Sequence, residues 1–169
     1  PNTSNPRSLQ EAGRLDPLLR AIRETNDEFA SKMGCNCVPV LLKISPDESF
    51  RSLDLILELV FRHGIDGIIA TNSTASRSGP SGKGCTEAGG LSGTPLRKRS
   101  TEVVRYLSKA SEGRLPIIGV GGILDAASAG EKFDAGASLV QVYSGLVYKG
   151  PMFAKHLASS LALRGSNWA

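Results

Sequence analysis

The sequence predicts an α/β fold, and more narrowly the C-terminal (β/α)4 half of a (β/α)8 barrel. Four short apolar segments, each bounded by turn residues, are typical of buried parallel strands. Helical patterns lie between them, so strands and helices alternate along the 169 residues. An open doubly wound sheet would give the same alternation. A whole barrel takes about 250 residues, and a lone four-stranded sheet would have two unpaired edges. The length therefore favours half of a barrel.

The predicted strands are runs of Val, Ile and Leu that end at polar or glycine residues. They cover residues 38–44, 67–71, 115–120 and 137–142. The apolar spacing between and around them predicts helices over residues 15–33, 50–61, 97–109, 126–133 and 152–163. Glycines at 64, 113 and 136 stand where three of these helices should end before a strand. Asp125 is the expected N-cap of the fourth helix.

Composition and charge set limits on the function. Hydrophobic residues make up 40% and charged residues 21%, which predicts a folded chain. No apolar run approaches the roughly 20 residues of a membrane span. The net charge of +4 is concentrated in residues 76–114, and aromatic residues are only 5%. Such a basic region with few aromatics fits an anion site or a solvated face, and we expect no nucleic-acid partner.

The cysteine count is odd. Cys35, Cys37 and Cys85 have no second Cys or His pair at zinc spacing. We therefore expect ordinary thiols that are buried or half-exposed, and no metal site.

The residues that leave each strand mark the expected site, because ligands of α/β folds bind at the carboxyl ends of the strands. Lys43 lies within the first apolar run, where it is either a rim lysine or a cation held over a ligand that develops negative charge. Thr71, Asn72 and Ser73 follow the second strand, where they either form a capping turn or bind a planar polar ligand.

Glycine and serine dominate the later strand exits. A glycine-rich loop ends at Ser92 and Gly93, the third strand exits through Gly121 and Gly122, and the fourth exits through Tyr143 and Ser144. Two such exits in succession match the usual phosphate site of a barrel. Their spacing fits neither the dinucleotide fingerprint nor the P-loop, which excludes NAD and ATP. No triad or carboxylate pair stands at a strand end, so a bound cofactor is expected to carry the chemistry.

Five motifs in this order resemble the dihydroorotate dehydrogenases, and the ending at residues 143–151 favours class 2, the quinone-dependent form. The motifs are residues 42–47, 66–74, 89–93, 116–122 and 136–145. The resemblance covers the chain from residue 1 to about 163. It divides the 169 residues into a remnant of the active-site loop at 1–14 and four βα units at 38–163.

The resemblance implies FMN-dependent oxidation of dihydroorotate to orotate in pyrimidine biosynthesis, with a quinone as electron acceptor. Lys43 would be the catalytic residue, supporting the reduced flavin. Substrate would bind to Asn2, Asn72 and Ser73. FMN would be held by Lys43, Thr71, Ser92, Gly93, Gly121, Gly122, Tyr143 and Ser144. By the same resemblance, the protein would lie peripherally on the bacterial cytoplasmic membrane, or on the mitochondrial inner membrane of a eukaryote.

The chain also departs from the family pattern. The family's catalytic Ser stands immediately before the segment that Pro1, Asn2 and Thr3 resemble, and the first four strands have no counterpart here. We therefore expect the chain to act only with an N-terminal half of the barrel as partner, and to be inactive alone. The alternatives are a non-catalytic half barrel, stabilised by self-association, or another barrel that binds FMN or phosphate.

Overall fold

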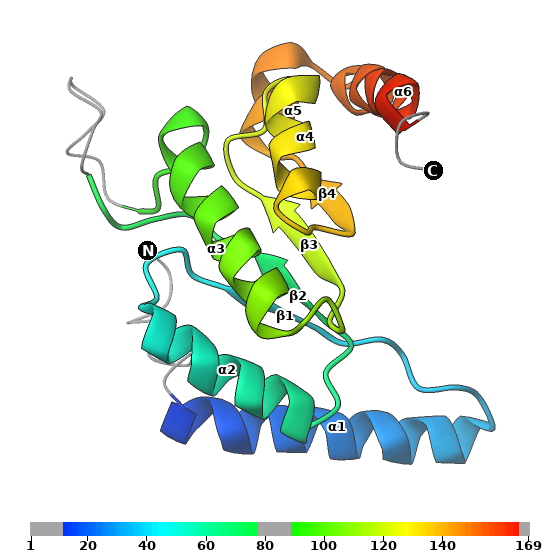
Figure 1. The fold of residues 1–169 in the computed structure, drawn as a ribbon. Coiled ribbons are helices and arrows are strands. Elements are labelled where there is room, and N and C mark those ends of the chain that lie inside the picture. Colours follow the sequence, from blue (N-terminus) through cyan, green and yellow to red (C-terminus); the bar gives the residue numbers. More distant parts are fainter. Residues whose placement is uncertain (1–11, 78–88, 166–169) are drawn as a thin grey trace.

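Within the described residues, the sheet is parallel and has four strands. The computed structural model describes residues 12–77 and 89–165. The strands β1 (Leu41–Ile44), β2 (Gly67–Ala70), β3 (Ile117–Val120) and β4 (Leu139–Gln141) pair in the order of the sequence (Figure 1). All three pairings are parallel. This confirms the predicted α/β alternation and gives a single edge at which all four strands end.

Helices precede, connect and follow the strands. They are α1 (Ala12–Met33), α2 (Phe50–Arg62), the 3-10 turn η3 (Thr94–Leu96), α3 (Arg97–Ala110), α4 (Ala126–Asp134), α5 (Ser144–Lys149) and α6 (Phe153–Gly165). Helix α3 packs against β2 and β3, and α4 packs against β3 and β4. Figure 1 shows α2, α3 and α4 following one another along one face of the sheet. Among the described residues, no helix has the length and apolar character that crossing a bilayer requires.

The main core lies between this helical layer and the sheet. Leu53, Ile56 and Val60 of α2 and Val103 and Val104 of α3 are buried, as the helical spacing predicts. They pack with buried strand residues, among them Ile44, Ile68 and Ile117. Burying one such side chain contributes about 1.5–3 kcal/mol, so this layer holds the strand ends in fixed positions.

A second, smaller cluster fixes the exit of β3. Ile123, Ala129, Phe153 and Leu157 are buried together and join α4 to α6. Ile123 belongs to the turn that follows β3, so this cluster ties that turn to the C-terminal helices.

Several sequence predictions need correction. The strands are shorter than expected, and Val38, predicted to begin the first strand, is exposed. Helix α5 was not predicted, and α1 begins at Ala12, within the segment expected to be loop. Cys35 and Cys37 are exposed rather than buried or half-exposed, and Cys85 lies outside the described residues.

The edge strands are also less buried than predicted. Leu41 and Lys43 of β1 and Leu139 and Gln141 of β4 are exposed. They sit at alternate positions of their strands, so they share the face opposite to the helices. The described residues leave this face uncovered at both edges, and a cavity at the carboxyl ends of the strands opens from it.

Candidate functional site

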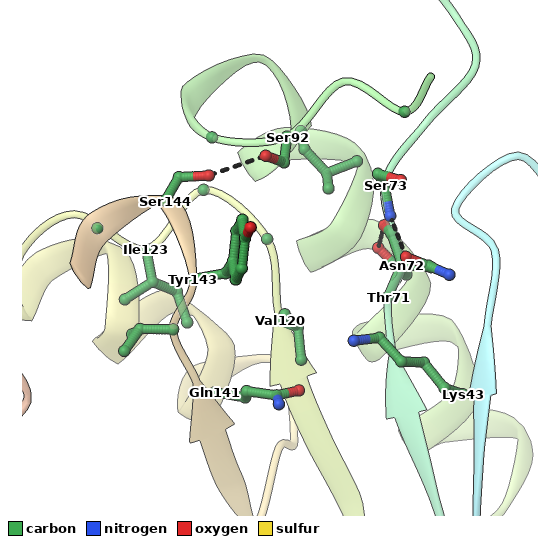
Figure 2. A pocket seen from close by; sticks show the side chains of 17 residues that line it. Lys43, Thr71, Asn72, Ser73, Ser92, Val120, Ile123, Gln141, Tyr143 and Ser144 are labelled. Atoms are coloured by element: carbon green, nitrogen blue, oxygen red, sulfur yellow. Dashed lines mark hydrogen bonds between the residues drawn. The ribbon is translucent and has the colours of Figure 1, made fainter. Parts of the chain in front are cut away.

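One cavity of about 320 Å³ lies at the carboxyl ends of the strands. This volume is near the lower end of the range for small-molecule sites. Figure 2 shows side chains converging on it from β1 and the β2 exit on one side and from β4 and its exit on the other. The lining residues are Lys43, Thr71, Asn72, Ser73, Gly90, Ser92, Gly93, Leu96, Val120, Gly121, Gly122, Ile123, Gln141, Val142, Tyr143, Ser144 and Gly145.

Strand register places the first side of the cavity. Lys43 is in register with Ile69, and the backbone N–H of Thr71 donates to the carbonyl of Val120 at 3.0 Å. Asn72 continues from there, and its Oδ1 accepts the Ser73 backbone N–H at 2.8 Å (Figure 2). The Asn72 side chain therefore takes part in a local turn, while its amide NH2 donates to none of the described residues and can donate to a ligand.

The loop after β2 is anchored at both of its described ends. Thr74 and Leu91 exchange backbone hydrogen bonds of 2.9 and 2.8 Å in an isolated antiparallel bridge. The Asp47 carboxylate accepts from the Thr74 hydroxyl and from the Ala75 N–H. Because this bridge precedes Ser92 directly, it fixes Ser92 at the rim of the cavity.

Ser92 and Ser144 join the loop to the exit of β4. Their hydroxyls hydrogen-bond at 2.8 Å across 52 residues of sequence (Figure 2). Tyr143, which precedes Ser144, is 74% exposed and stands beside the cavity with its ring free of the core. Two hydroxyls and an unburied aromatic ring therefore face the same space.

The turn after β3 lies directly on the start of α3. Gly121 and Gly122 have φ values of 117° and 70°, in the region that favours glycine. A Cβ on Gly122 would lie 2.3 Å from the Cβ of Arg97, so no side chain fits there. The wall of the cavity at this point is consequently bare backbone, which a ligand can approach closely.

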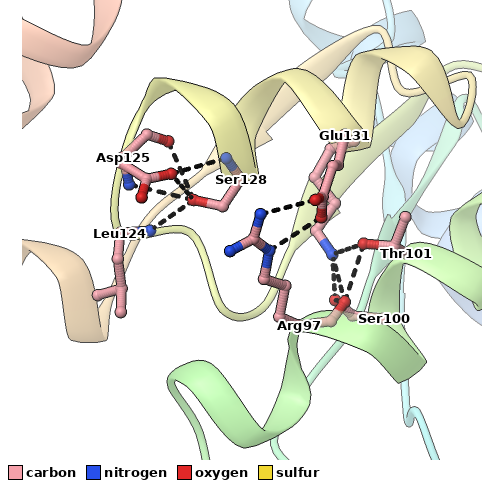
Figure 3. A network of polar contacts seen from close by, with 8 residues as sticks. Arg97, Ser100, Thr101, Leu124, Asp125, Ser128 and Glu131 are labelled. Atoms are coloured by element: carbon pink, nitrogen blue, oxygen red, sulfur yellow. Dashed lines mark hydrogen bonds and ion pairs between the residues drawn. The ribbon is translucent and has the colours of Figure 1, made fainter.

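The charge around the cavity suits an anion. Among its described lining residues none is acidic, and Lys43 is the charged one. Two carboxylates that follow the β3 exit, Asp125 and Glu131, are engaged in other contacts. Glu131 forms a bidentate pair with Arg97 at 2.6 and 2.9 Å (Figure 3). This pair lowers the pKa of Glu131, and hydrogen bonds from Ser128 lower the pKa of Asp125.

The structure brings the sequence-predicted site residues together, with one exception. All of them except Asn2 line this cavity, and Asn2 lies outside the described residues. Their individual roles remain predictions. Gln141 was not among the predicted site residues, yet it lines the cavity beside Val120, its partner in the β3–β4 register. The alternation of β4 could have identified it, because Leu139 and Gln141 share one face.

Comparison with known proteins gives one consistent family. A family model described as Dihydroorotate dehydrogenase matches residues 1–164. Proteins named dihydroorotate dehydrogenase (quinone) are 51% identical over 165 residues in Nitrosospira multiformis and 49% identical over 162 residues in Cronobacter sakazakii. Each alignment covers 95% of this chain but only 46% and 48% of the relative, so the chain spans about half the length of these proteins.

Solved structures agree with this comparison. DHODH from Eimeria tenella in complex with ferulenol superposes with a TM-score of 0.86 at 30% identity, covering 95% of this chain and 46% of that one. The ligand-free form gives 0.88 at 29% identity, with 98% and 49% covered. These neighbours are TIM barrels, and the parallel sheet matches about half of one. The chain therefore belongs to the dihydroorotate dehydrogenase family.

Proposed function

We propose that the chain forms the cofactor-phosphate side of a quinone-dependent dihydroorotate dehydrogenase, with FMN as the cofactor. It would oxidise dihydroorotate to orotate as part of a longer or two-chain enzyme. The observation that carries the proposal is that the polar strand exits meet at one cavity whose described lining has no acidic residue. The quinone-linked names of the curated relatives support the choice of electron acceptor.

The groups on one side of the cavity fit a phosphate. Ser92 and Ser144 supply hydroxyls, and the bare backbone at Gly121 and Gly122 lets phosphate oxygens approach N–H groups that a side chain would cover. A carboxylate in this wall would repel the dianion, and the described lining has none. In the proposal, Gly93 and Tyr143 complete the enclosure of the phosphate and its ribityl chain.

The groups on the other side fit the flavin ring and the substrate. When bound, FMN supplies a ring that accepts a hydride from the substrate. The Lys43 ammonium would stabilise the negative charge of the reduced ring, and within the described residues Lys43 forms no ion pair that would compete. Thr71 would contact the ring, and the free amide NH2 of Asn72, with the Ser73 hydroxyl, would bind the pyrimidine.

Loss of a proton from dihydroorotate needs a base. The described lining residues include no carboxylate and no imidazole, and the Ser92 and Ser144 hydroxyls bond to each other. We therefore expect the proton acceptor to come from the rest of the enzyme. The 169-residue chain alone should bind the flavin without oxidising dihydroorotate. Quinone reduction would place the assembled enzyme peripherally on a membrane, the bacterial cytoplasmic membrane by analogy with the bacterial relatives.

Orotate binding tests the proposal. The wild-type chain is loaded with FMN, and orotate is titrated while the visible flavin spectrum is recorded. We expect a saturable shift that Asn72→Ala reduces and that Asn36→Ala, an exposed asparagine before β1, leaves unchanged. A chain that binds FMN but gives no response to orotate would favour another flavin-binding barrel. A chain that binds neither would contradict the proposal.

A further inference from the structure

We propose that Lys132 is a positioning residue, which holds the Gly121–Gly122 turn in the shape that accepts the cofactor phosphate. The inference rests on the proposed function, because it concerns the same phosphate site. Lys132 is on α4, outside the cavity lining, and it would act on the cofactor through Ser100 and Gly121.

The surroundings of Lys132 are unusual for a lysine. Its side chain is fully buried, although lysine is rarely buried without a charged partner. Its three N–H donors meet three acceptors, namely the Arg97 carbonyl at 3.1 Å, the Thr101 hydroxyl at 2.6 Å and the Ser100 hydroxyl. None of these is a carboxylate, and the adjacent Glu131 pairs with Arg97 instead (Figure 3). The ammonium is thus fully hydrogen-bonded without a direct counter-charge.

A short chain of hydrogen bonds joins this ammonium to the cavity wall at Gly121 and Gly122. The Ser100 hydroxyl, which accepts from Lys132, donates to the carbonyl of Gly121 at 3.1 Å. A Cβ on Gly121 would lie 2.8 Å from the Ser100 oxygen, so the turn rests directly on this hydroxyl. Gly122 in turn lies against the backbone of Arg97, whose carbonyl Lys132 also binds. Lys132 therefore fixes both residues of α3 on which the turn rests.

The stem of Lys132 supports the same strand. A Cβ on Gly119 would lie 2.9 Å from the Cβ of Lys132, which shows how closely α4 packs on β3 just before the turn begins. A shorter or branched side chain at position 132 would change this packing contact. It would also leave the hydroxyls of Ser100 and Thr101 without the donor that Lys132 supplies.

Charge gives the arrangement a dependence on pH. Burial lowers the pKa of Lys132 to about 8; the nearby Glu131 raises it, whereas Arg97 and Arg105 of α3 lower it further. Strand β3 adds no titratable group. The neutral amine has two N–H donors for three acceptors, and it no longer places a positive charge behind the turn. Affinity for the phosphate should therefore fall as the pH rises through about 8.

The test compares FMN with riboflavin, which lacks the phosphate, by quenching of flavin fluorescence in the full 169-residue chain. Wild type, Lys132→Met and the exposed-lysine control Lys155→Met are measured below and above pH 8. Loss of a charged hydrogen bond should weaken FMN binding by about tenfold or more in Lys132→Met. Riboflavin binding and the control should stay within about twofold. Wild type should lose FMN affinity at high pH, and Lys132→Met should show no such pH dependence.

A second variant covers the case in which Lys132→Met does not fold. Ser100→Ala keeps the lysine but removes the link to Gly121, and it should show the same selective loss of FMN. Equal weakening of FMN and riboflavin, or no change in either variant, would overturn the inference and leave the proposed function intact. A wild-type chain that binds neither flavin would overturn both.

Discussion

Single residues set the shape of the cavity wall after β3, and two glycines show how. Gly122 and Gly113 have nearly the same positive φ, 70° and 69°. They differ in surroundings, because a Cβ at 122 would lie 2.3 Å from Arg97 whereas a Cβ at 113 would meet nothing within 4 Å. Alanine substitutions at the two positions therefore separate the energetic cost of a positive φ from the cost of close packing.

Gly113→Ala should lower the free energy of unfolding by about 1 kcal/mol, because alanine is strained at positive φ. Gly122→Ala should lower the free energy of unfolding by a further ~1–3 kcal/mol, because the turn must also move away from α3. Urea unfolding of both variants against wild type measures the difference. Equal losses would mean that the turn does not pack on Arg97 as described.

Titration of Lys132 should change the free energy of unfolding as well as flavin binding. Its folded pKa of about 8 is below the ordinary 10.5, so the unfolded chain binds more protons between these values. The cost of burying the charged form is therefore fully present below about pH 8 and disappears as the pH rises toward 10.5. Urea unfolding across this range should show wild type gaining stability relative to Lys132→Met. Parallel curves would show that Lys132 is not titrating in the folded chain.

At the residue scale, the sequence predicted most residues that line the cavity, but it did not predict the buried Lys132 behind the turn after β3. Lys43 and Asn72 could be chosen because they follow apolar strands, and chain position alone brings strand ends to one edge. Lys132 could not, because its partners Ser100 and Thr101 lie more than thirty residues earlier, on another helix. Nothing in a single charged position of α4 distinguishes a buried lysine from a solvated one.

At the scale of elements, α4 joins the turn after β3 to the helical layer. Its N-cap, Asp125, accepts the Ser128 backbone N–H at 2.7 Å, and the Ser128 side chain accepts the Asp125 N–H at 3.1 Å (Figure 3). This reciprocal capping box confirms the predicted cap and fixes where the helix begins relative to Gly122.

Asp125→Ala should lower the free energy of unfolding by about 1 kcal/mol. Asp125→Asn, which keeps an accepting oxygen, should lower the free energy of unfolding much less. Because Ser128 lowers the pKa of Asp125, the contribution of the cap is present above its ordinary pKa of 3.8 and is lost as the pH falls below that value. Thermal melts of both variants at neutral and acidic pH measure this. An alanine variant as stable as the asparagine variant at neutral pH would contradict it.

Element types followed from periodicity, whereas element ends did not. The four strands and five helices were placed correctly because apolar spacing decides burial. Strand lengths were overestimated: Val38 is apolar, but it lies before β1 and its backbone hydrogen-bonds to the Asn26 side chain instead of to a neighbouring strand. Helix α5 was missed because six residues beginning at Ser144 and Gly145 give no helical period.

At the scale of the whole molecule, the described chain leaves apolar surface uncovered. Leu139 is 61% exposed on the open face of β4, and Phe29 and Met33 of α1 are 54% and 64% exposed. Edge strands β1 and β4 each pair on one side only within the described residues. The sequence predicted half of a barrel but also fully buried strands, and these two expectations conflict, because half of a barrel exposes the inner face of its sheet.

The chain should self-associate when it is studied alone, because exposed apolar faces and unpaired edges favour association. Sedimentation velocity over a range of concentrations should show dimers or larger species. Leu139→Lys should shift the distribution toward monomer. Adding Lys155→Leu on the outer helix α6 restores the net charge, and this double variant should remain shifted toward monomer. A wild-type chain that stays monomeric throughout would show that the open face is not associative.

The central claim is that this cavity binds the phosphate of a flavin cofactor, and one titration tests it most directly. The wild-type chain is titrated with FMN and, separately, with riboflavin, and the quenching of flavin fluorescence is followed. We expect saturable binding of one FMN per chain, at least about tenfold tighter than riboflavin, because the phosphate adds charged hydrogen bonds. Equal affinity for the two flavins, or no saturable binding of FMN, would contradict it.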